Sequence, residues 1–293
     1  MQGIIVKAIA GFYYVKIDEA IIECKARGRF RNSGTSPLVG DIVSISLDGN
    51  KGAIEEVIPR KNFLLRPPIA NLDKLFIISS SVTPTPNTLL IDRMTVICKY
   101  KGIDPIIVFN KSDLADLEAY KQIYLNAGFK TIVCSAVTGE GIDEIKSELS
   151  GCVSAFTGNS GAGKSSILNL LFPHLKLNTA EVSEKLGRGR HTTRHTELFS
   201  HNYDGFVADT PGFSAIENEK SDIDFKEALP TLFPDFYDFF DKCRFHDCKH
   251  ISEKGCGVLE ATLSGQIQKT RYDSYCAIYN ELKDIKPWEI KSR

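Results

Sequence analysis

The sequence predicts a multidomain protein in which an N-terminal β-barrel of the OB type and a central α/β domain precede a C-terminal, mostly helical, metal-binding domain. Short strand patterns separated by turn residues fill the first 65 residues, and strand and helix patterns then alternate to about residue 217. Three cysteines and a histidine crowd into fourteen residues near the C-terminus. We place the domains at residues 1–65, 66–220 and 221–293, because a chain of 293 residues is long enough for two or three hydrophobic cores.

Composition excludes several classes of protein. The formal net charge is −1, so no overall field draws the chain to nucleic acid or to a membrane, and any basic contact surface must be local. No stretch approaches the roughly 18 uninterrupted apolar residues of a membrane-spanning helix, and the first residues lack the pattern of a signal peptide. Eight cysteines in a chain of this length are not a disulfide framework. We therefore expect a cytoplasmic protein without a membrane partner.

The N-terminal region contains five short strand patterns and no helical run. They cover residues 4–10, 12–17, 20–25, 41–47 and 52–58, with turn signals such as Gly11, Gly40 and Asp48-Gly49-Asn50 between them. Five such strands predict a small barrel, and the OB type matches best. Residues 59–68, which are rich in proline and basic residues, are expected to form a connector.

A run of basic residues begins at the end of the third strand. Lys25, Arg27, Arg29 and Arg31 fall within seven residues that contain no acidic residue. OB-type barrels bind oligonucleotides through one face and its loops, and phosphate contacts supply much of that affinity. We predict that these four side chains contact RNA, and the alternative is an ordinary solvated surface.

The central region alternates apolar strands with helical segments. Strand patterns lie at 75–80, 105–110, 131–135, 153–158, 196–201 and 205–209, and helical patterns lie at 88–101, 113–127, 142–149 and 164–171. This alternation predicts a doubly wound α/β sheet, in which ligands bind at the carboxyl ends of the strands.

A glycine-rich loop connects the strand at 153–158 to the helix at 164–171. Its sequence is GNSGAGKS, and the strand–loop–helix context predicts a phosphate-binding loop whose backbone N–H groups face the phosphates. Lys164 is expected to reach the β- and γ-phosphates, and Ser165 to ligate Mg²⁺. The predicted nucleotide contacts are Gly158, Asn159, Ser160, Gly161, Ala162, Gly163, Lys164, Ser165 and Ser166.

Two motifs earlier in the chain predict that the base is guanine. Asn110-Lys111-Ser112-Asp113 ends the strand at 105–110, and the Asp113 carboxylate can accept the N1–H and 2-amino hydrogens of guanine. Adenine offers no such pair of donors, and an unpaired buried polar group costs about 1–3 kcal/mol. Ser135-Ala136 ends the next strand, where small residues let backbone N–H groups approach the guanine O6. We predict that Asn110, Lys111, Asp113, Ser135 and Ala136 belong to the GTP site.

A third motif, Asp209-Thr210-Pro211-Gly212, closes the strand at 205–209. Asp209 is expected to hold Mg²⁺ through a water molecule, and the Gly212 N–H is expected to contact the γ-phosphate. In the polar segment 187–195 we expect Thr193 to complete the magnesium shell, with Thr192 as the alternative.

Phe213 occupies the position where Ras-like enzymes place a glutamine that orients the attacking water. A phenyl ring cannot orient water, so intrinsic hydrolysis should be slow. Another group or a partner must position the water molecule. His191 and His195 are candidates, and the alternative is that both are ordinary exposed residues.

The order of these motifs is rotated relative to an ordinary GTPase. There the phosphate loop comes first and the base-reading motif comes late, whereas here residues 110–113 precede the loop at 158–165. The termini of compact domains often lie close together, so rejoining them elsewhere preserves the core. The central domain is therefore predicted to be a circularly permuted P-loop GTPase domain.

The cysteine cluster predicts a metal site. Cys243, Cys248, His250 and Cys256 form a Cys₃His set that suits tetrahedral Zn²⁺ and leaves no open position, so we predict one structural zinc ion per chain. His246 is a competing ligand, and free cysteines are the alternative to a metal site. Basic residues at 242, 244, 249 and 254 serve either RNA contact or solvation.

Five other cysteines and an aromatic stripe are predicted to pack in the interior. We expect five cysteines to act as small buried hydrophobic residues: Cys24, Cys98, Cys134, Cys152 and Cys276. A helix-spaced stripe near the C-terminus, expected to pack against a core, comprises Tyr272, Tyr275, Ile278, Tyr279 and Leu282.

Together these motifs resemble the RsgA (YjeQ/YloQ) family of bacterial ribosome-assembly GTPases. The resemblance covers the barrel, the permuted order of NKSD, CSA, GNSGAGKS, GRHTTRH and DTPGF, and the cluster CRFHDCKHISEKGC. It implies a GTP hydrolase that binds the small ribosomal subunit and its rRNA during late maturation, with hydrolysis stimulated by that subunit. It also implies GTP and GDP as ligands, Mg²⁺ with the nucleotide and an apolar residue at Phe213. A monomer is the simplest arrangement.

Two other functions compete with this reading. In an RNA-binding module, nucleotide would only lock the structure, and stimulation of hydrolysis by ribosomal subunits separates this case from a GTPase switch. A GTPase of membrane or metal trafficking is disfavoured, because the sequence has no basic amphipathic helix or lipidation signal and a closed Cys₃His site does not transfer metal.

Overall fold

The computed structural model describes residues 1–28, 30, 36–49, 51–65, 67–173, 196–202, 204–209 and 226–283 of the chain. The chain divides into two compact units. The first comprises Met1–Phe76, Asp143–Thr157 and Lys164–Ala215, and the second comprises Ile77–Ile142, Gly158–Gly163 and Ile216–Arg293. Each unit therefore collects segments that lie far apart in the sequence.

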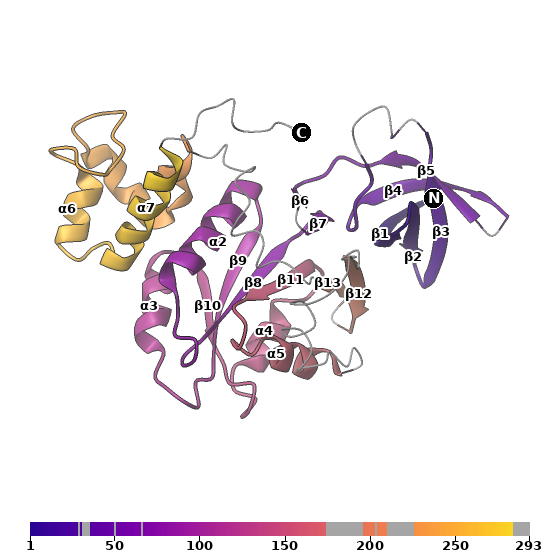
Figure 1. Cartoon of the computed structure of the whole chain (residues 1–293), viewed down its shortest axis with the longest axis horizontal. Coiled ribbons are helices and arrows are strands. Elements are labelled where there is room, and N and C mark those ends of the chain that lie inside the picture. Colours follow the sequence, from indigo (N-terminus) through magenta and orange to yellow (C-terminus); the bar gives the residue numbers. More distant parts are fainter. Residues whose placement is uncertain are drawn as a thin grey trace, which may run out of the picture. The chain divides into compact units, whose positions relative to one another are not determined.

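The first unit begins with the predicted five-stranded barrel (Figure 1). Its strands are β1 (Gln2–Ile9), β2 (Phe12–Ile17), β3 (Ala20–Ala26), β4 (Ile42–Asp48) and β5 (Lys51–Val57). β1 pairs antiparallel with both β2 and β4, and β2 pairs antiparallel with β3. β3 pairs parallel with β5, which pairs antiparallel with β4, so the five strands close on one another. Fully buried side chains fill the interior: Ile5, Val15, Cys24, Val43 and Ile54.

The expected connector at 59–68 contains the first strand of a β-hairpin. β6 (Phe63–Leu65) pairs antiparallel with β7 (Pro68–Ala70). The short apolar run at 63–65 forms a strand because its side chains alternate between the exposed and the buried side. Leu64 and its partner Ile69 are both buried, so this segment adds to the core rather than only spanning a gap.

The first unit also holds strands from the central region. β11 (Val153–Gly158) pairs parallel with β13 (Gly205–Asp209), and β13 pairs antiparallel with β12 (Glu197–His201). The start of β8 (Lys74–Ser80) joins β11 through stacking of Phe76 on Phe156, with ring centroids 4.5 Å apart. The helices α4 (Ile142–Ser147) and α5 (Lys164–Leu171) complete the alternating pattern that the sequence predicts.

In the second unit the strands run in the order β10–β9–β8. β9 (Asp104–Asn110) and β10 (Lys130–Val133) are parallel, and the helices of this part are α2 (Thr88–Lys101) and α3 (Glu118–Asn126). α3 begins five residues later than the pattern 113–127 predicts. Leu114 N donates to Lys111 O in a turn, and the Asp116 carboxylate accepts from Glu118 N, which starts the helix there.

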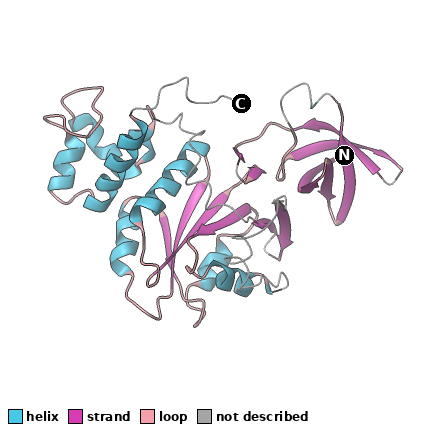
Figure 2. Cartoon of the chain, in the orientation of Figure 1, coloured by secondary structure: helices cyan, strands magenta, loops and turns pink. Residues whose placement is uncertain are grey.

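The C-terminal part of the second unit is helical, as predicted (Figure 2). It contains the 3₁₀ helices η4 (Leu229–Leu232) and η5 (Pro234–Lys242), then α6 (Gly257–Leu263) and α7 (Lys269–Leu282). One buried cluster unites these helices with Val96 of α2. Tyr272, Tyr275, Ile278 and Leu282 are buried in this cluster, and Tyr279 packs against it, so the stripe is a packing face.

Among the scattered cysteines, four are buried and Cys276 is half-buried. This confirms the packing role for those four, and Cys276 packs against the C-terminal core. No helix in the described ranges is long and apolar enough to cross a membrane.

Candidate nucleotide site and metal centre

The phosphate-binding loop depends on glycine at three positions. Gly158, Gly161 and Gly163 have φ angles of +152°, +81° and +89°, which side chains with a Cβ rarely adopt. A Cβ atom at Gly163 would overlap the Asn110 amide nitrogen, and one at Gly158 would overlap the carbonyl oxygen of Ile78. The loop therefore packs directly against Ile78 and Asn110. The helix α5 begins at Lys164, as predicted.

Asn110 joins three of the predicted segments. Its side-chain Nδ2 donates to the Ala162 carbonyl at 2.9 Å, and its Oδ1 accepts from the Ala136 N–H at 3.1 Å. The residue is 1% exposed, so both bonds lie in the interior. The base-reading motif, the Ser135-Ala136 motif and the phosphate loop are thus held together by one amide group, which is the arrangement a guanine-nucleotide site needs.

Ser135 orients the carboxylate of Asp113. Its hydroxyl donates to Asp113 Oδ1 at 2.5 Å and accepts from the Val137 and Thr138 N–H groups, each at 3.2 Å. Asp113 is exposed, whereas Ser135 is fully buried. An exposed carboxylate whose Oδ1 is held by the Ser135 hydroxyl presents its other oxygen to a ligand, as guanine recognition requires.

A segment that the sequence analysis missed, 81–83, supports Lys111. Lys111 has a φ of +68°, and its carbonyl accepts from the Ser81 hydroxyl at 2.8 Å. Its Nζ donates to the Val82 and Thr83 carbonyls at 3.4 and 3.3 Å. The only signal in the sequence is the polar run that ends the strand at 75–80, where ligands of an α/β sheet bind.

The predicted magnesium residues are described in part. Ser165 lies in the first turn of α5 and is half-buried, and Ser166 beside it is exposed. Asp209 ends β13, where its backbone pairs with Glu197. Thr193, its alternative Thr192 and the Gly212 N–H lie outside the described residues. The same holds for Phe213, His191 and His195.

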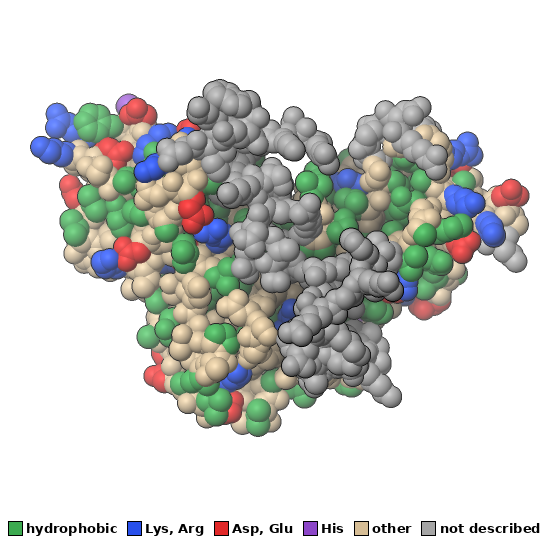
Figure 3. All heavy atoms as spheres, viewed as in Figure 1, with side chains coloured by type: hydrophobic (Ala, Val, Ile, Leu, Met, Phe, Trp, Pro, Cys, Tyr) green, Lys and Arg blue, Asp and Glu red, His purple; other side chains and the backbone are tan. Residues whose placement is uncertain are grey.

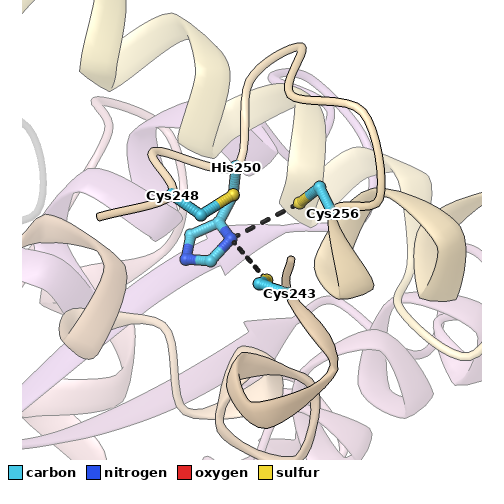
Figure 4. A group of neighbouring side chains, drawn as sticks. All are labelled: Cys243, Cys248, His250 and Cys256. Atoms are coloured by element: carbon cyan, nitrogen blue, oxygen red, sulfur yellow. Dashed lines mark hydrogen bonds between the residues drawn. The ribbon is translucent and has the colours of Figure 1, made fainter. Parts of the chain in front are cut away.

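The cysteines and the histidine of the C-terminal cluster converge as predicted (Figure 4). One potential ligand atom from each of Cys243, Cys248, His250 and Cys256 lies within 4.8 Å of the others. His250 Nδ1 is 3.5 Å from Cys243 Sγ and 3.4 Å from Cys256 Sγ. The competing His246 is exposed and lies outside this group, which favours His250 as the fourth ligand. The group can hold a metal ion.

The surroundings of the four side chains suit thiolates bound to a cation. Burial raises the pKa of the Cys248 thiol to about 12, and burial lowers the pKa of His250, so the uncharged forms are favoured without a cation. The Gly257 N–H points at Cys243 Sγ from 3.3 Å and the Leu259 N–H at Cys256 Sγ from 3.4 Å. Such N–H donors stabilise metal-bound thiolates.

Hydroxyl groups of α7 fix the loop that carries His250. Tyr272 Oη donates to the carbonyls of His250 and Ile251, at 2.9 and 3.0 Å, and Tyr275 Oη donates to the Lys249 carbonyl at 2.6 Å. The His250 ring stacks on Phe240 with centroids 5.2 Å apart. His250 is therefore held in place both by Phe240 on its ring face and by the hydrogen bond to its backbone carbonyl.

Comparison with known proteins assigns the family. A model of the RsgA GTPase domain matches residues 57–219, and a model of the RsgA N-terminal domain matches residues 2–54. The chain belongs to the RsgA GTPase family. It is accordingly a GTP hydrolase, and the rotated motif order is that of a circularly permuted GTPase.

Relatives of this RsgA chain match over nearly the whole length. The protein named small ribosomal subunit biogenesis GTPase RsgA from Caldanaerobacter subterraneus subsp. tengcongensis is 45% identical, with 97% of this chain and 96% of the relative covered. The protein of that name from Bacillus anthracis is 43% identical, with 98% and 99% covered.

Two solved structures share the fold. YjeQ from Thermotoga maritima is 34% identical with a TM-score of 0.82, covering 97% of this chain and 99% of its own. YloQ, described as a circularly permuted GTPase, is 35% identical with a TM-score of 0.81, covering 98% of this chain and 96% of its own.

The predicted RNA-contacting residues of this RsgA GTPase differ in their surroundings. Lys25 is exposed and holds its ammonium 5.0 Å from the centroid of the Phe12 ring. Arg27 pairs with Glu55 at 2.5 Å, which offsets its charge locally. Arg29 and Arg31 lie outside the described residues. Figure 3 shows Lys and Arg side chains interspersed with hydrophobic ones on the visible face of the barrel.

Proposed function

We propose that this RsgA GTPase binds the small ribosomal subunit and assists its late maturation, with slow intrinsic hydrolysis that the subunit stimulates. The observation that carries the GTPase part of the proposal is the Asn110 amide, which joins the base-reading motifs to the phosphate loop. The partner is supported by relatives named small ribosomal subunit biogenesis GTPase, which match at 40–45% identity over nearly the whole chain.

The nucleotide site combines the residues of the four motifs. Asp113, oriented by Ser135, reads guanine, while Lys164 and the loop backbone bind the phosphates. Mg²⁺ is held by Ser165, Thr193 and Asp209. The remaining GTP contacts are Asn110, Lys111, Ala136, Gly158, Asn159, Ser160, Gly161, Ala162, Gly163, Ser166 and Gly212. Because Phe213 cannot orient water, the subunit supplies or positions the missing group.

The metal of the Cys₃His group is proposed to be one structural Zn²⁺ per chain. Three thiolates and an imidazole within reach of one ion match its preferred tetrahedral set and leave no position for substrate. Zinc would then stabilise the fold of the C-terminal domain rather than take part in hydrolysis.

The three domains divide the work in this proposal. Residues 1–65 form the barrel that contacts rRNA through Lys25, Arg27, Arg29 and Arg31. Residues 66–220 form the GTPase domain, and residues 221–293 form the zinc domain. We propose a monomer that acts in the cytoplasm.

The test is GTP turnover by the purified protein alone, with small subunits and with large subunits. We expect slow turnover alone and strong stimulation by small subunits only. Ser165→Ala should abolish the stimulated rate, because the magnesium ligand is lost. Ser147→Ala, on the exposed side of α4, is the matched control and should behave as wild type. Flat turnover in every mixture would instead favour an RNA-binding module in which nucleotide only locks the structure.

A further inference from the structure

A guanidinium group lies fully buried between α2 and the C-terminal helices. Arg271 of α7 is 0% exposed, and its Nη1 donates to Asp92 of α2 at 2.6 Å. Its Nη2 and Nε donate to the carboxylate of Asp235 in η5, at 2.8 and 3.2 Å. A buried charge is tolerated only when it is paired, so one side chain fixes the position of two other elements.

Aromatic rings complete the enclosure of this charge. The guanidinium carbon lies 4.6 Å from the ring centroid of Phe233, 5.3 Å from that of Phe129 and 5.9 Å from that of Tyr124. Planar guanidinium groups bind two carboxylates and stack on rings at once, which an ammonium group cannot do. The site is therefore specific for arginine.

The residues around Arg271 contact the strand that carries the base-reading motif. Tyr124 also packs on Phe109, with centroids 5.9 Å apart, and Phe109 directly precedes Asn110. The Tyr124 hydroxyl donates to the Thr88 carbonyl at the start of α2, at 3.4 Å. The segment that leads into α2 holds Lys111 through the Val82 and Thr83 carbonyls. A movement of α2 would consequently shift the residues of the base-reading motif.

The arrangement around Arg271 also reaches the metal centre. Tyr272 follows Arg271 directly, and with Tyr275 it holds the backbone of residues 249–251, which includes His250. Phe236, on the same 3₁₀ helix as Asp235, packs edge-on against His250 with centroids 6.5 Å apart. All of these residues lie in the second compact unit.

We propose that Arg271 couples the two sites, so that metal bound by the Cys₃His group strengthens binding of guanine nucleotide and nucleotide strengthens retention of the metal. This rests on the proposed nucleotide and metal sites above. Coupling between two binding equilibria is reciprocal, and typical values change affinity by about 5–150-fold. Arg271 does not touch either ligand and acts as a positioning residue.

The first experiment measures affinity for a fluorescent GDP analogue, in excess Mg²⁺, before and after removal of the bound metal with a zinc-selective chelator. We expect binding to weaken at least about fivefold after removal and to recover when Zn²⁺ is added back. Equal affinity with and without metal would overturn the coupling. Absence of GDP binding by the metal-loaded protein would overturn the proposed function instead, so the two failures are distinguishable.

The second experiment tests the residue. Arg271→Lys keeps the charge but loses the two-carboxylate geometry, so the effect of metal on GDP affinity should shrink severalfold. Lys269→Met, which removes an exposed i,i+4 pair with Asp273 on the same helix, is the matched control and should keep the full effect. A folded Arg271→Lys protein with an unchanged effect of metal would contradict our assignment.

A third measurement does not depend on a variant that folds. Hydrogen exchange of the α2 amides, residues 88–101, is compared in wild-type protein with and without metal. We expect faster exchange in α2 after metal removal, because α7 no longer holds Arg271 against Asp92. Loss of protection confined to residues 243–263, with α2 unchanged, would show that the metal stabilises only its own loop and would overturn the proposal.

Discussion

Asn110 and Gly163 depend on each other in the nucleotide site. The Asn110 amide lies where a Cβ atom at position 163 would sit, and it bonds the carbonyl of the neighbouring Ala162. Glycine at 163 is therefore required both by its φ of +89° and by the close approach of another side chain. At Gly161 the φ is similar, +81°, but the nearest atoms to a Cβ would be 3.6 Å away.

This pair of glycines gives a matched test. Gly161→Ala and Gly163→Ala carry similar backbone strain, of about 1–2 kcal/mol. Gly163→Ala should lower the free energy of unfolding by a further 1–3 kcal/mol, roughly, because it also displaces Asn110. Urea unfolding of both variants without nucleotide measures the difference. Equal losses would mean that the loop opens freely and that the Asn110 contact adds little.

At the scale of elements, the loop between η5 and α6 is organised by one carboxylate. Glu253 accepts hydrogen bonds from the N–H groups of Lys249, Ile251 and Ser252, at 2.8, 2.9 and 3.0 Å. Burial by itself raises the pKa of Glu253, but these backbone bonds together hold the pKa below its ordinary value. The ionised carboxylate thus stabilises the loop that carries His250.

The sign of this shift sets the pH dependence. A lowered folded-state pKa means that the stabilisation is complete above the unfolded value of about 4.3 and is lost as pH falls through the lower, folded value. Glu253→Gln should therefore destabilise the protein by about 1 kcal/mol near pH 7 and by progressively less below pH 4, roughly. Unfolding measured from neutral to acid pH checks this, with Glu260→Gln on the exposed side of α6 as the control. A loss that is constant with pH would show that shape, not charge, matters at position 253.

Some elements could be predicted from sequence and others could not. The barrel strands, α2 and α5 follow from periodicity and turn residues, which are local signals. The hairpin of β6 and β7 could not, because a three-residue strand carries too short a pattern and is stabilised by burial of Leu64 and Ile69. The late start of α3 was missed because the turn at Lys111 and the Asp116 carboxylate compete with the helical pattern.

At the scale of the whole molecule, a net charge of −1 requires that any attraction to rRNA be local. Among the described residues, Arg27 pairs with Glu55, whereas the Lys25 ammonium group lies against the face of the Phe12 ring. Of these two described basic residues of the barrel, Lys25 therefore has the charge that is more available to a phosphate group.

We expect Lys25→Ala to weaken binding to small ribosomal subunits and to reduce the slope of log affinity against log salt by about 1. Lys269→Ala removes an exposed lysine of α7 that is paired with Asp273, and it should leave the slope unchanged. Affinity measured across a series of salt concentrations distinguishes the two. The same slope for Lys25→Ala and wild type would remove this residue from the rRNA contact.

The sequence by itself determined the chemistry of this protein. The order and spacing of the motifs at 110–113, 158–165 and 209–212 predict a permuted GTPase, and the Cys₃His spacing predicts a metal site, because each motif carries its donors within a few residues. Tertiary structure alone decided how these parts are joined. The Asn110–Ala162 bond spans 52 positions and the Asp92–Arg271 pair spans 179, and no local pattern encodes contacts that exist only once the chain has buried both partners.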